Sequence, residues 1–232
     1  MHASGIPSIL IFFTLFIVSC SQNKESNNTG AAGPVDSTAI LIAQYPDSVD
    51  LLNQSAFNAL QSGDTGKSIQ FLSHSLGVKL DQPEVENELG FLLAAIKSEQ
   101  SLSIATRMTK SEKALVAAQG HYIKGLYFAN IENEIEAIRS FDSSIISNFT
   151  FTNAYIEKAI LLTGAGKYDL AIDVLTKAME LDRKNADIYF WLGSCLEGKK
   201  DIEKASAYYQ EAIRLDPQHE GAIRSFNNLK KQ

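Results

Sequence analysis

The sequence has few cysteines and no clusters of basic residues, and each shortage excludes a class of protein. Two of the 232 residues are cysteines, Cys20 and Cys195, which is too few for a disulfide-stapled domain. The formal net charge is −6, and the longest basic runs are the pairs Lys199-Lys200 and Lys230-Lys231. Neutralising phosphates requires clustered Lys and Arg, so we expect no nucleic-acid partner.

The apolar run near the N-terminus is too short to cross a membrane. Residues 9–18 form ten consecutive positions of largely apolar sequence. As a helix they would measure about 15 Å, half of the roughly 30 Å that a bilayer core requires. The run ends at Ser19 and Cys20 and is followed by polar sequence. A short apolar core that ends at a small residue is typical of a secretory signal.

The segment Ile17-Val18-Ser19-Cys20 resembles the lipobox of bacterial lipoproteins, in which the signal is cut before the cysteine and its thiol is acylated. The resemblance implies a signal peptide at residues 1–19 and a membrane anchor at Cys20. Ser21, the next residue, fits sorting to the outer membrane of the cell envelope. Residues 1–8 depart from the usual pattern because they contain no Lys or Arg. A secreted protein cut near Ser19 and a buried apolar helix are the alternatives.

We assign residues 20–44 to the lipidated cysteine and a flexible tether, because most of this segment is rich in Ser, Asn, Gly and Ala and has no apolar periodicity.

Small and bulky residues recur every 34 positions in the second half of the chain. Five series keep this period: Gly125, Ala159 and Gly193; Ala137, Ala171 and Ala205; Ser144, Ala178 and Ala212; Phe141, Leu175 and Tyr209; Phe128, Leu162 and Leu196. A period of 34 is typical of a solenoid of helix–turn–helix units. Small residues let two helices approach closely, and the bulky ones fill the space between them.

These residues resemble the tetratricopeptide repeat (TPR), most closely in the unit that begins at Tyr189, Leu192 and Gly193 and ends at Leu215-Asp216-Pro217. The resemblance implies an all-α fold, a right-handed superhelical solenoid of antiparallel helix pairs. We expect three clear units at residues 118–219, two degenerate units at 45–117, and a capping helix at 220–232.

The resemblance also implies a partner-binding groove lined by the first helix of each unit. Its groove-facing places fall on six residues: Tyr122, Leu126, Ile156, Ile160, Phe190 and Ser194. The family's clamp for chaperone carboxylates needs Lys, Arg and Asn at such places, so that clamp is absent. We expect the mostly apolar strip to bind an amphipathic helix or an extended apolar segment of a partner protein. Alternatively, the capping helix or the degenerate units fill the strip.

No group of residues indicates catalysis, a metal or a cofactor. The four histidines, His2, His74, His121 and His219, lie far apart and have no metal-type spacing. Cys195 lies among packing residues, where a buried and inert thiol is expected. We therefore expect no enzyme but a membrane-anchored lipoprotein that acts as a scaffold or adaptor for proteins of the bacterial cell envelope. The alternative is a glycan- or nutrient-binding surface lipoprotein.

Overall fold

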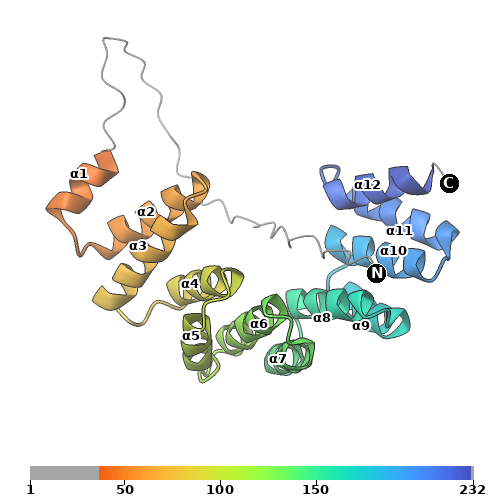
Figure 1. The fold of residues 1–232 in the computed structure, drawn as a ribbon, viewed down its shortest axis with the longest axis horizontal. Helices are drawn as coiled ribbons and strands as arrows, with labels where there is room; N and C mark the ends of the chain where they lie inside the picture. Colours follow the sequence, from red (N-terminus) through yellow and green to blue (C-terminus); the bar gives the residue numbers. More distant parts are fainter. Residues whose placement is uncertain (1–36, 231–232) are drawn as a thin grey trace, which may run out of the picture. The chain divides into compact units, whose positions relative to one another are not determined.

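The computed structural model describes residues 37–230. The expected signal peptide, Cys20 and most of the tether lie outside this range. The described residues form twelve α-helices and no strand (Figure 1). Their bounds are α1 Ser37–Gln44, α2 Val49–Gln61, α3 Thr65–Val78, α4 Pro83–Ala95, α5 Gln100–Met108, α6 Ala114–Asn130, α7 Glu134–Ser147, α8 Thr152–Gly164, α9 Tyr168–Leu181, α10 Ala186–Gly198, α11 Ile202–Leu215 and α12 Glu220–Leu229.

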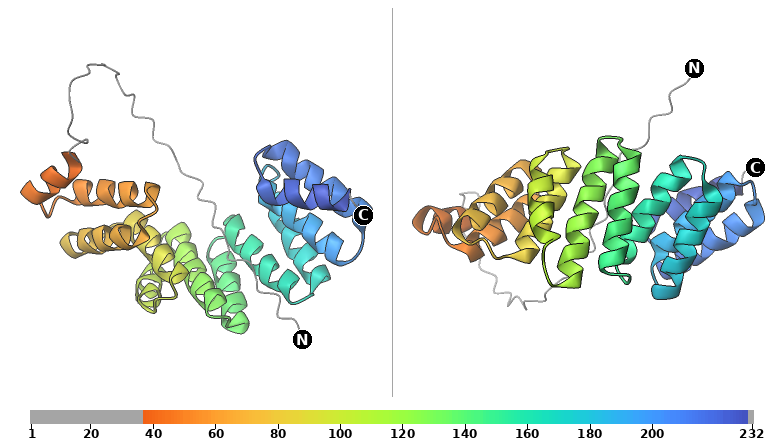
Figure 2. Two further views of the ribbon diagram at one scale, coloured as in Figure 1. Left: turned by 45° about the horizontal axis from the view of Figure 1, so that its top comes forward. Right: turned by 90° about the horizontal axis from the view of Figure 1, so that it is seen from below.

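The helices pack as successive pairs, which confirms the all-α solenoid. The pairs are α2 with α3, α4 with α5, α6 with α7, α8 with α9, and α10 with α11, and each pair packs on the next (Figures 1 and 2). The helix α12 packs on α11, as expected of a cap. One expectation is wrong, because α1 lies within the segment assigned to the flexible tether and packs against α2.

A left-handed residue marks the turn inside every pair. Positive φ angles occur at Gly63, Lys97, Glu132, Gly166 and Lys200, at intervals of 34 or 35 residues. In three pairs the next residue caps the second helix: the side chains of Asp64, Asn133 and Asp201 accept a hydrogen bond from the backbone N–H three residues later. This regular turn identifies five helix pairs, including the two that sequence similarity left degenerate.

Close contacts within the pairs confirm the predicted purpose of the small residues. Gly125 of α6 lies against the ring of Phe141 of α7, and Gly193 of α10 lies against the ring of Tyr209 of α11. Both rings are almost completely buried, as are Ala137 and Ala205 on the same two helices. The repeat period therefore records positions where one helix has room for an aromatic ring of its partner.

The second helix of the α4–α5 pair departs from this order. Its buried residues are Ser101, Ile104, Ala105 and Met108, and the small Ala105 stands where α7 carries the bulky Phe141. The following helix compensates through Gly120, where a Cβ atom would lie 2.7 Å from the backbone oxygen of Ala105. The helix α6 thus packs directly on the backbone of α5, and the small/bulky period does not extend into this pair.

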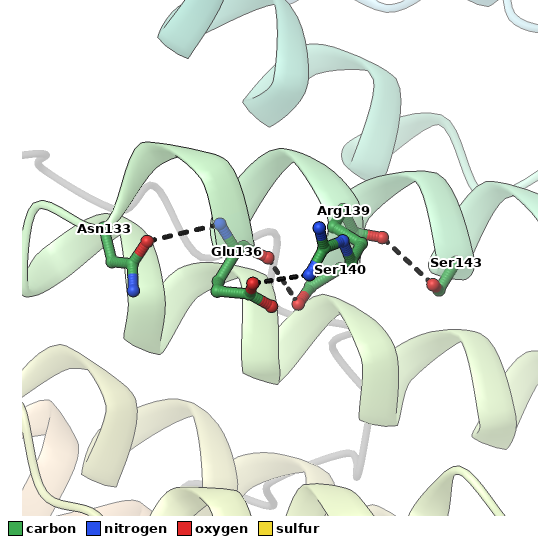
Figure 3. A network of polar contacts seen from close by, with 5 residues as sticks. All are labelled: Asn133, Glu136, Arg139, Ser140 and Ser143. Atoms are coloured by element: carbon green, nitrogen blue, oxygen red, sulfur yellow. Dashed lines mark hydrogen bonds and ion pairs between the residues drawn. The ribbon is translucent and has the colours of Figure 1, made fainter.

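Ion pairs and side-chain hydrogen bonds cover the exposed face of the second helices. In α7 the side chain of Asn133 caps the first turn, Arg139 pairs with Glu136 at 2.5 Å, and Ser140 and Ser143 donate to backbone oxygens one turn earlier (Figure 3). Glu134 pairs with Lys167 of the next unit at 3.6 Å. The acidic residues at the start of α7 therefore form ion pairs on the surface of the helix and across the junction with the next unit.

Candidate functional site

The six residues of the expected groove lie on the first helices of three successive pairs. Tyr122 and Leu126 belong to α6, Ile156 and Ile160 to α8, and Phe190 and Ser194 to α10. Ile160, Phe190 and Ser194 are half-buried. Tyr122, Leu126 and Ile156 are buried, with exposed fractions of 6%, 5% and 8%. The expectation of a continuous open strip is therefore wrong for the first half of the strip, where the side chains belong to the core.

The burial of Tyr122 has a specific cause in its aromatic neighbours. Its ring centre lies 6.0 Å from that of Phe91 in α4, 5.8 Å from Phe141 in α7, and 5.2 Å from Phe151, which precedes α8. The contact with Phe151 is edge-to-face, an arrangement that aromatic pairs favour. Tyr122 thus joins three helix pairs, and a partner has little access to its ring.

The capping helix covers one side of Phe190. The ring of His219, the N-cap residue of α12, lies 4.9 Å from that of Phe190. A Cβ atom on Gly221 would lie 3.1 Å from Phe190, so the absence of a side chain at Gly221 permits this approach. These contacts correspond to the alternative in which the capping helix fills part of the strip. Apart from Phe190, the half-buried residues of the expected groove are Ile160 and Ser194.

Polar groups connect the same helices beside the apolar residues. The hydroxyl group of Tyr122 donates to Glu157 Oε1 of α8 at 3.5 Å. Asp187 of α10 lies 3.1 Å from Nε2 of His219. Because Nδ1 of His219 accepts a hydrogen bond from the N–H of Ala222, a neutral ring carries its proton on Nε2 and donates it to Asp187.

The environment shifts the pKa values of these groups. Burial, with the nearby charge of Asp187, raises the pKa of Glu157 to about 7, although the hydrogen bond from Tyr122 opposes the rise. Burial and Glu157 raise the pKa of Tyr122. The hydrogen bond to Asp187 raises the pKa of His219, although partial burial opposes it. Glu157 therefore stands out as a carboxyl group that changes charge near neutral pH.

Sequence reasoning did not single out Glu157. Its position in the sequence could have indicated a role at the groove. Glu157 follows the groove residue Ile156 and lies 35 positions after Tyr122, close to one repeat period. Residues at the same place of successive first helices lie on neighbouring turns of the solenoid. A charged residue inside an otherwise apolar strip was therefore the detectable sign.

The remaining chemistry-bearing residues lie apart from this face or are inert. Cys195 is buried, its sulfur lies 3.1 Å from the hydroxyl oxygen of Thr163, and burial raises the pKa of its thiol. Among residues 37–230 no three or more His, Cys, Asp or Glu side chains form a group that could hold a metal ion. Over the same residues, no helix combines the length and the apolar character that crossing a bilayer would require.

A family model and the fold agree on what this array is. Residues 162–226 match a model described as tetratricopeptide repeat. This part of the chain contains tetratricopeptide repeats. Over 95 residues the chain is 32% identical to the transcription factor tau 131 kDa subunit of Saccharomyces cerevisiae. The aligned region covers 40% of this chain and 9% of that subunit. The chain covers between 9% and 15% of the lengths of the curated relatives that it matches.

Solved TPR structures share the fold over most of the chain. A tetratricopeptide repeat protein from Parabacteroides merdae has a TM-score of 0.67 at 17% identity, covering 84% of this chain and 75% of that one. YrrB, described as a TPR protein with an unusual peptide-binding site, has a TM-score of 0.50 at 18% identity, covering 85% of this chain and 99% of that one. Likeness at these identities establishes the TPR solenoid as the fold.

Proposed function

We propose that this chain is a lipid-anchored TPR protein that holds a segment of a partner protein at the bacterial cell envelope, on the outer membrane. Stacked helix pairs form extended surfaces that bind other proteins. The observation that carries the proposal is the pair of half-buried residues Ile160 and Ser194, which stand at groove places of adjacent first helices. YrrB, which shares this fold and is described as having a peptide-binding site, supports a peptide-binding role for such an array.

The anchor in this proposal rests on the sequence around Cys20, where a short apolar run ends at a cysteine. Two or more acyl chains would hold the chain stably to a membrane. The variant Cys20→Ser tests this part. We expect the unaltered chain to take up a labelled fatty acid and to sediment with outer membranes, and Cys20→Ser to lose both properties. Equal labelling of the two proteins would contradict lipidation at Cys20.

The binding face is tested by photo-crosslinking in living cells. A photoreactive residue at Ser194 stands on the proposed face, and one at Lys177 of α9 stands on an exposed second helix as the matched control. We expect Ser194 to give one defined adduct with a second protein and Lys177 to give none. Adducts of equal yield from both positions, or only intramolecular adducts from Ser194, would contradict the proposal.

The alternative, a glycan-binding function, is less well supported than protein binding. Such sites present exposed aromatic platforms, whereas Trp191, the single tryptophan of the chain, is half-buried and packs against the core formed by α8, α9 and α10. The protein-binding role is therefore the function that the geometry supports best.

A further inference from the structure

One carboxyl group stands in an apolar interface with little to stabilise its charge. Glu157 lies on α8 between the buried residues Ile156 and Ala159. Glu157 accepts a hydrogen bond from the Tyr122 hydroxyl, which at 3.5 Å is at the limit of a hydrogen bond. Glu157 is half-buried. A carboxylate that is partly removed from water without a cationic partner is costly, and the cost is relieved when it takes up a proton.

The charged groups on the neighbouring helices do not compensate Glu157. Tyr122 from α6 and Asp187 from α10 are the titratable groups that act on it, and Asp187 carries the same negative charge. On α7, Asp142 pairs with Lys158, and on α9, Asp169 pairs with Lys199. Lys158 stands next to Glu157 in the sequence, yet its ammonium group is held 2.5 Å from Asp142. Lys158 and Lys199 are thus engaged elsewhere.

We propose that the carboxyl group of Glu157 is a proton-binding switch that controls the packing of α6, α8 and α10. When protonated, the group is neutral and fits the apolar interface. When ionised, it is poorly solvated and is repelled by Asp187, so the junction of the three first helices loosens. This inference goes beyond the proposed scaffold role and depends neither on the lipid anchor nor on a partner.

The geometry places the working range of this switch near neutral pH. Burial sets the pKa of Glu157 at about 7, far above that of an ordinary glutamate. Asp187 is in turn hydrogen-bonded to His219, and this bond raises the pKa of His219. Acidification therefore favours the neutral form of Glu157, and a rise in pH favours its ionised form.

A second glutamate, at the equivalent place of another first helix, supports this proposal. Glu88 stands two residues before Gly90, as Glu157 stands two residues before Ala159, and these small residues share a repeat place. Its Oε1 atom is buried without a hydrogen-bond partner, and burial raises its pKa. The fold thus places a poorly solvated carboxyl group at the same position of two first helices.

The proton on Glu157 is measured by NMR on the full chain carrying Cys20→Ser, labelled with ¹³C at the glutamate carboxyl carbons. The resonance of Glu157 is the one that disappears in Glu157→Gln. We expect its titration midpoint to lie above pH 6. Asp187→Asn should lower the midpoint because it removes a negative charge, and Tyr122→Phe should raise it because it removes a donor. A midpoint at or below pH 6 would overturn the proposal.

The effect on packing is measured by the fluorescence of Trp191, which lies on α10 and is the only tryptophan. We expect its emission to change between pH 6 and 8 with the midpoint of Glu157, and Glu157→Gln to abolish the change. His219→Asn, which keeps a helix-capping side chain but cannot titrate, should retain it. A transition that survives in Glu157→Gln, or that disappears in His219→Asn, would show that Glu157 does not control the packing.

Discussion

Gly193 of α10 lies directly against the ring of Tyr209 of α11: a Cβ atom on Gly193 would be 2.7 Å from ring carbon Cδ1. The ring cannot move away freely, because the Tyr209 hydroxyl donates to Glu197 at 2.6 Å. The two helices of this pair are therefore fixed at a separation that only glycine allows. The same relationship joins Gly125 of α6 to Phe141 of α7. This contact connects the sequence period to the stability of the array.

We expect Gly193→Ala to lower the free energy of unfolding by about 1–3 kcal/mol, because the added methyl group forces the helices apart. Urea denaturation of the full chain measures the change. Gly164→Ala is the matched control, since a Cβ at Gly164 meets no atom within 4 Å. The control should leave stability unchanged or slightly raised, and an equal loss in both variants would contradict this account of the glycine.

At a turn residue with a left-handed backbone, introducing glycine should raise the stability of the chain. Lys200 has a φ of 65°, a backbone conformation that costs a residue with a side chain about 1 kcal/mol. Lys200→Gly should therefore stabilise the chain by up to about 1 kcal/mol, whereas Gly166→Ala should destabilise it by a similar amount. Thermal unfolding measures both changes.

A control for the turn prediction is available in the same segment. Ala165, which precedes Gly166, has a φ of −79°, so Ala165→Gly relieves no strain. Stabilisation by Ala165→Gly equal to that by Lys200→Gly would show that the gain does not come from the left-handed backbone.

The ion pair between Glu86 and Arg107 holds the α4–α5 pair together. The side chain of Glu86 is only 9% exposed and accepts from Nε of Arg107 at 2.8 Å. Arg107→Met leaves a buried carboxylate without its partner, and we expect a loss of about 1–3 kcal/mol in unfolding free energy. The double variant Arg107→Met with Glu86→Gln should recover part of the loss. A double variant less stable than Arg107→Met would contradict the assigned cause.

Stability should fall as pH rises from 5 to 8. The pKa of Glu157 is about 7 in the folded chain and about 4.5 as a free group, so the folded state binds more protons in this interval. At 1.36 kcal/mol for each pH unit, the loss amounts to about 2–3 kcal/mol above pH 7. His219 acts in the same direction, since its raised pKa gives stability that is present below its ordinary pKa and lost as pH rises.

Urea denaturation at a series of pH values measures this dependence. Glu157→Gln should flatten most of the slope between pH 5 and 7. An unchanged slope in the variant would assign the dependence to other groups.

The repeat period predicted the last three helix pairs because close packing there depends on single small residues, such as Gly125 and Gly193. It did not extend into α4 and α5, where Ala105 takes a place that is bulky elsewhere and Gly120 of the next helix restores the contact. Such compensation between two helices leaves no periodic signal. The turns were obscured for a similar reason, since Lys97 occupies a left-handed position that glycine usually marks.

The candidate site was predictable in position but not in exposure. The period placed Tyr122 and Ile160 on the correct helices, yet the burial of Tyr122 depends on Phe91 and Phe151, which belong to other repeats and follow no shared pattern. The contact between Phe190 and His219 likewise depends on how the capping helix docks. Long-range contacts of this kind arise from tertiary packing and are not encoded in a local period.

The most direct test of the central claim is the affinity of the partner, identified by its adduct at Ser194, for two matched variants. Ile160→Asp places a charge on the proposed binding face, and Leu170→Asp makes the same type of change on α9, where the side chain is 55% exposed. With both variants folded by circular dichroism, we predict that Ile160→Asp raises the Kd at least tenfold, about 1.4 kcal/mol, and that Leu170→Asp changes it less than twofold. Equal effects, or a larger effect of Leu170→Asp, would contradict binding through the first helices.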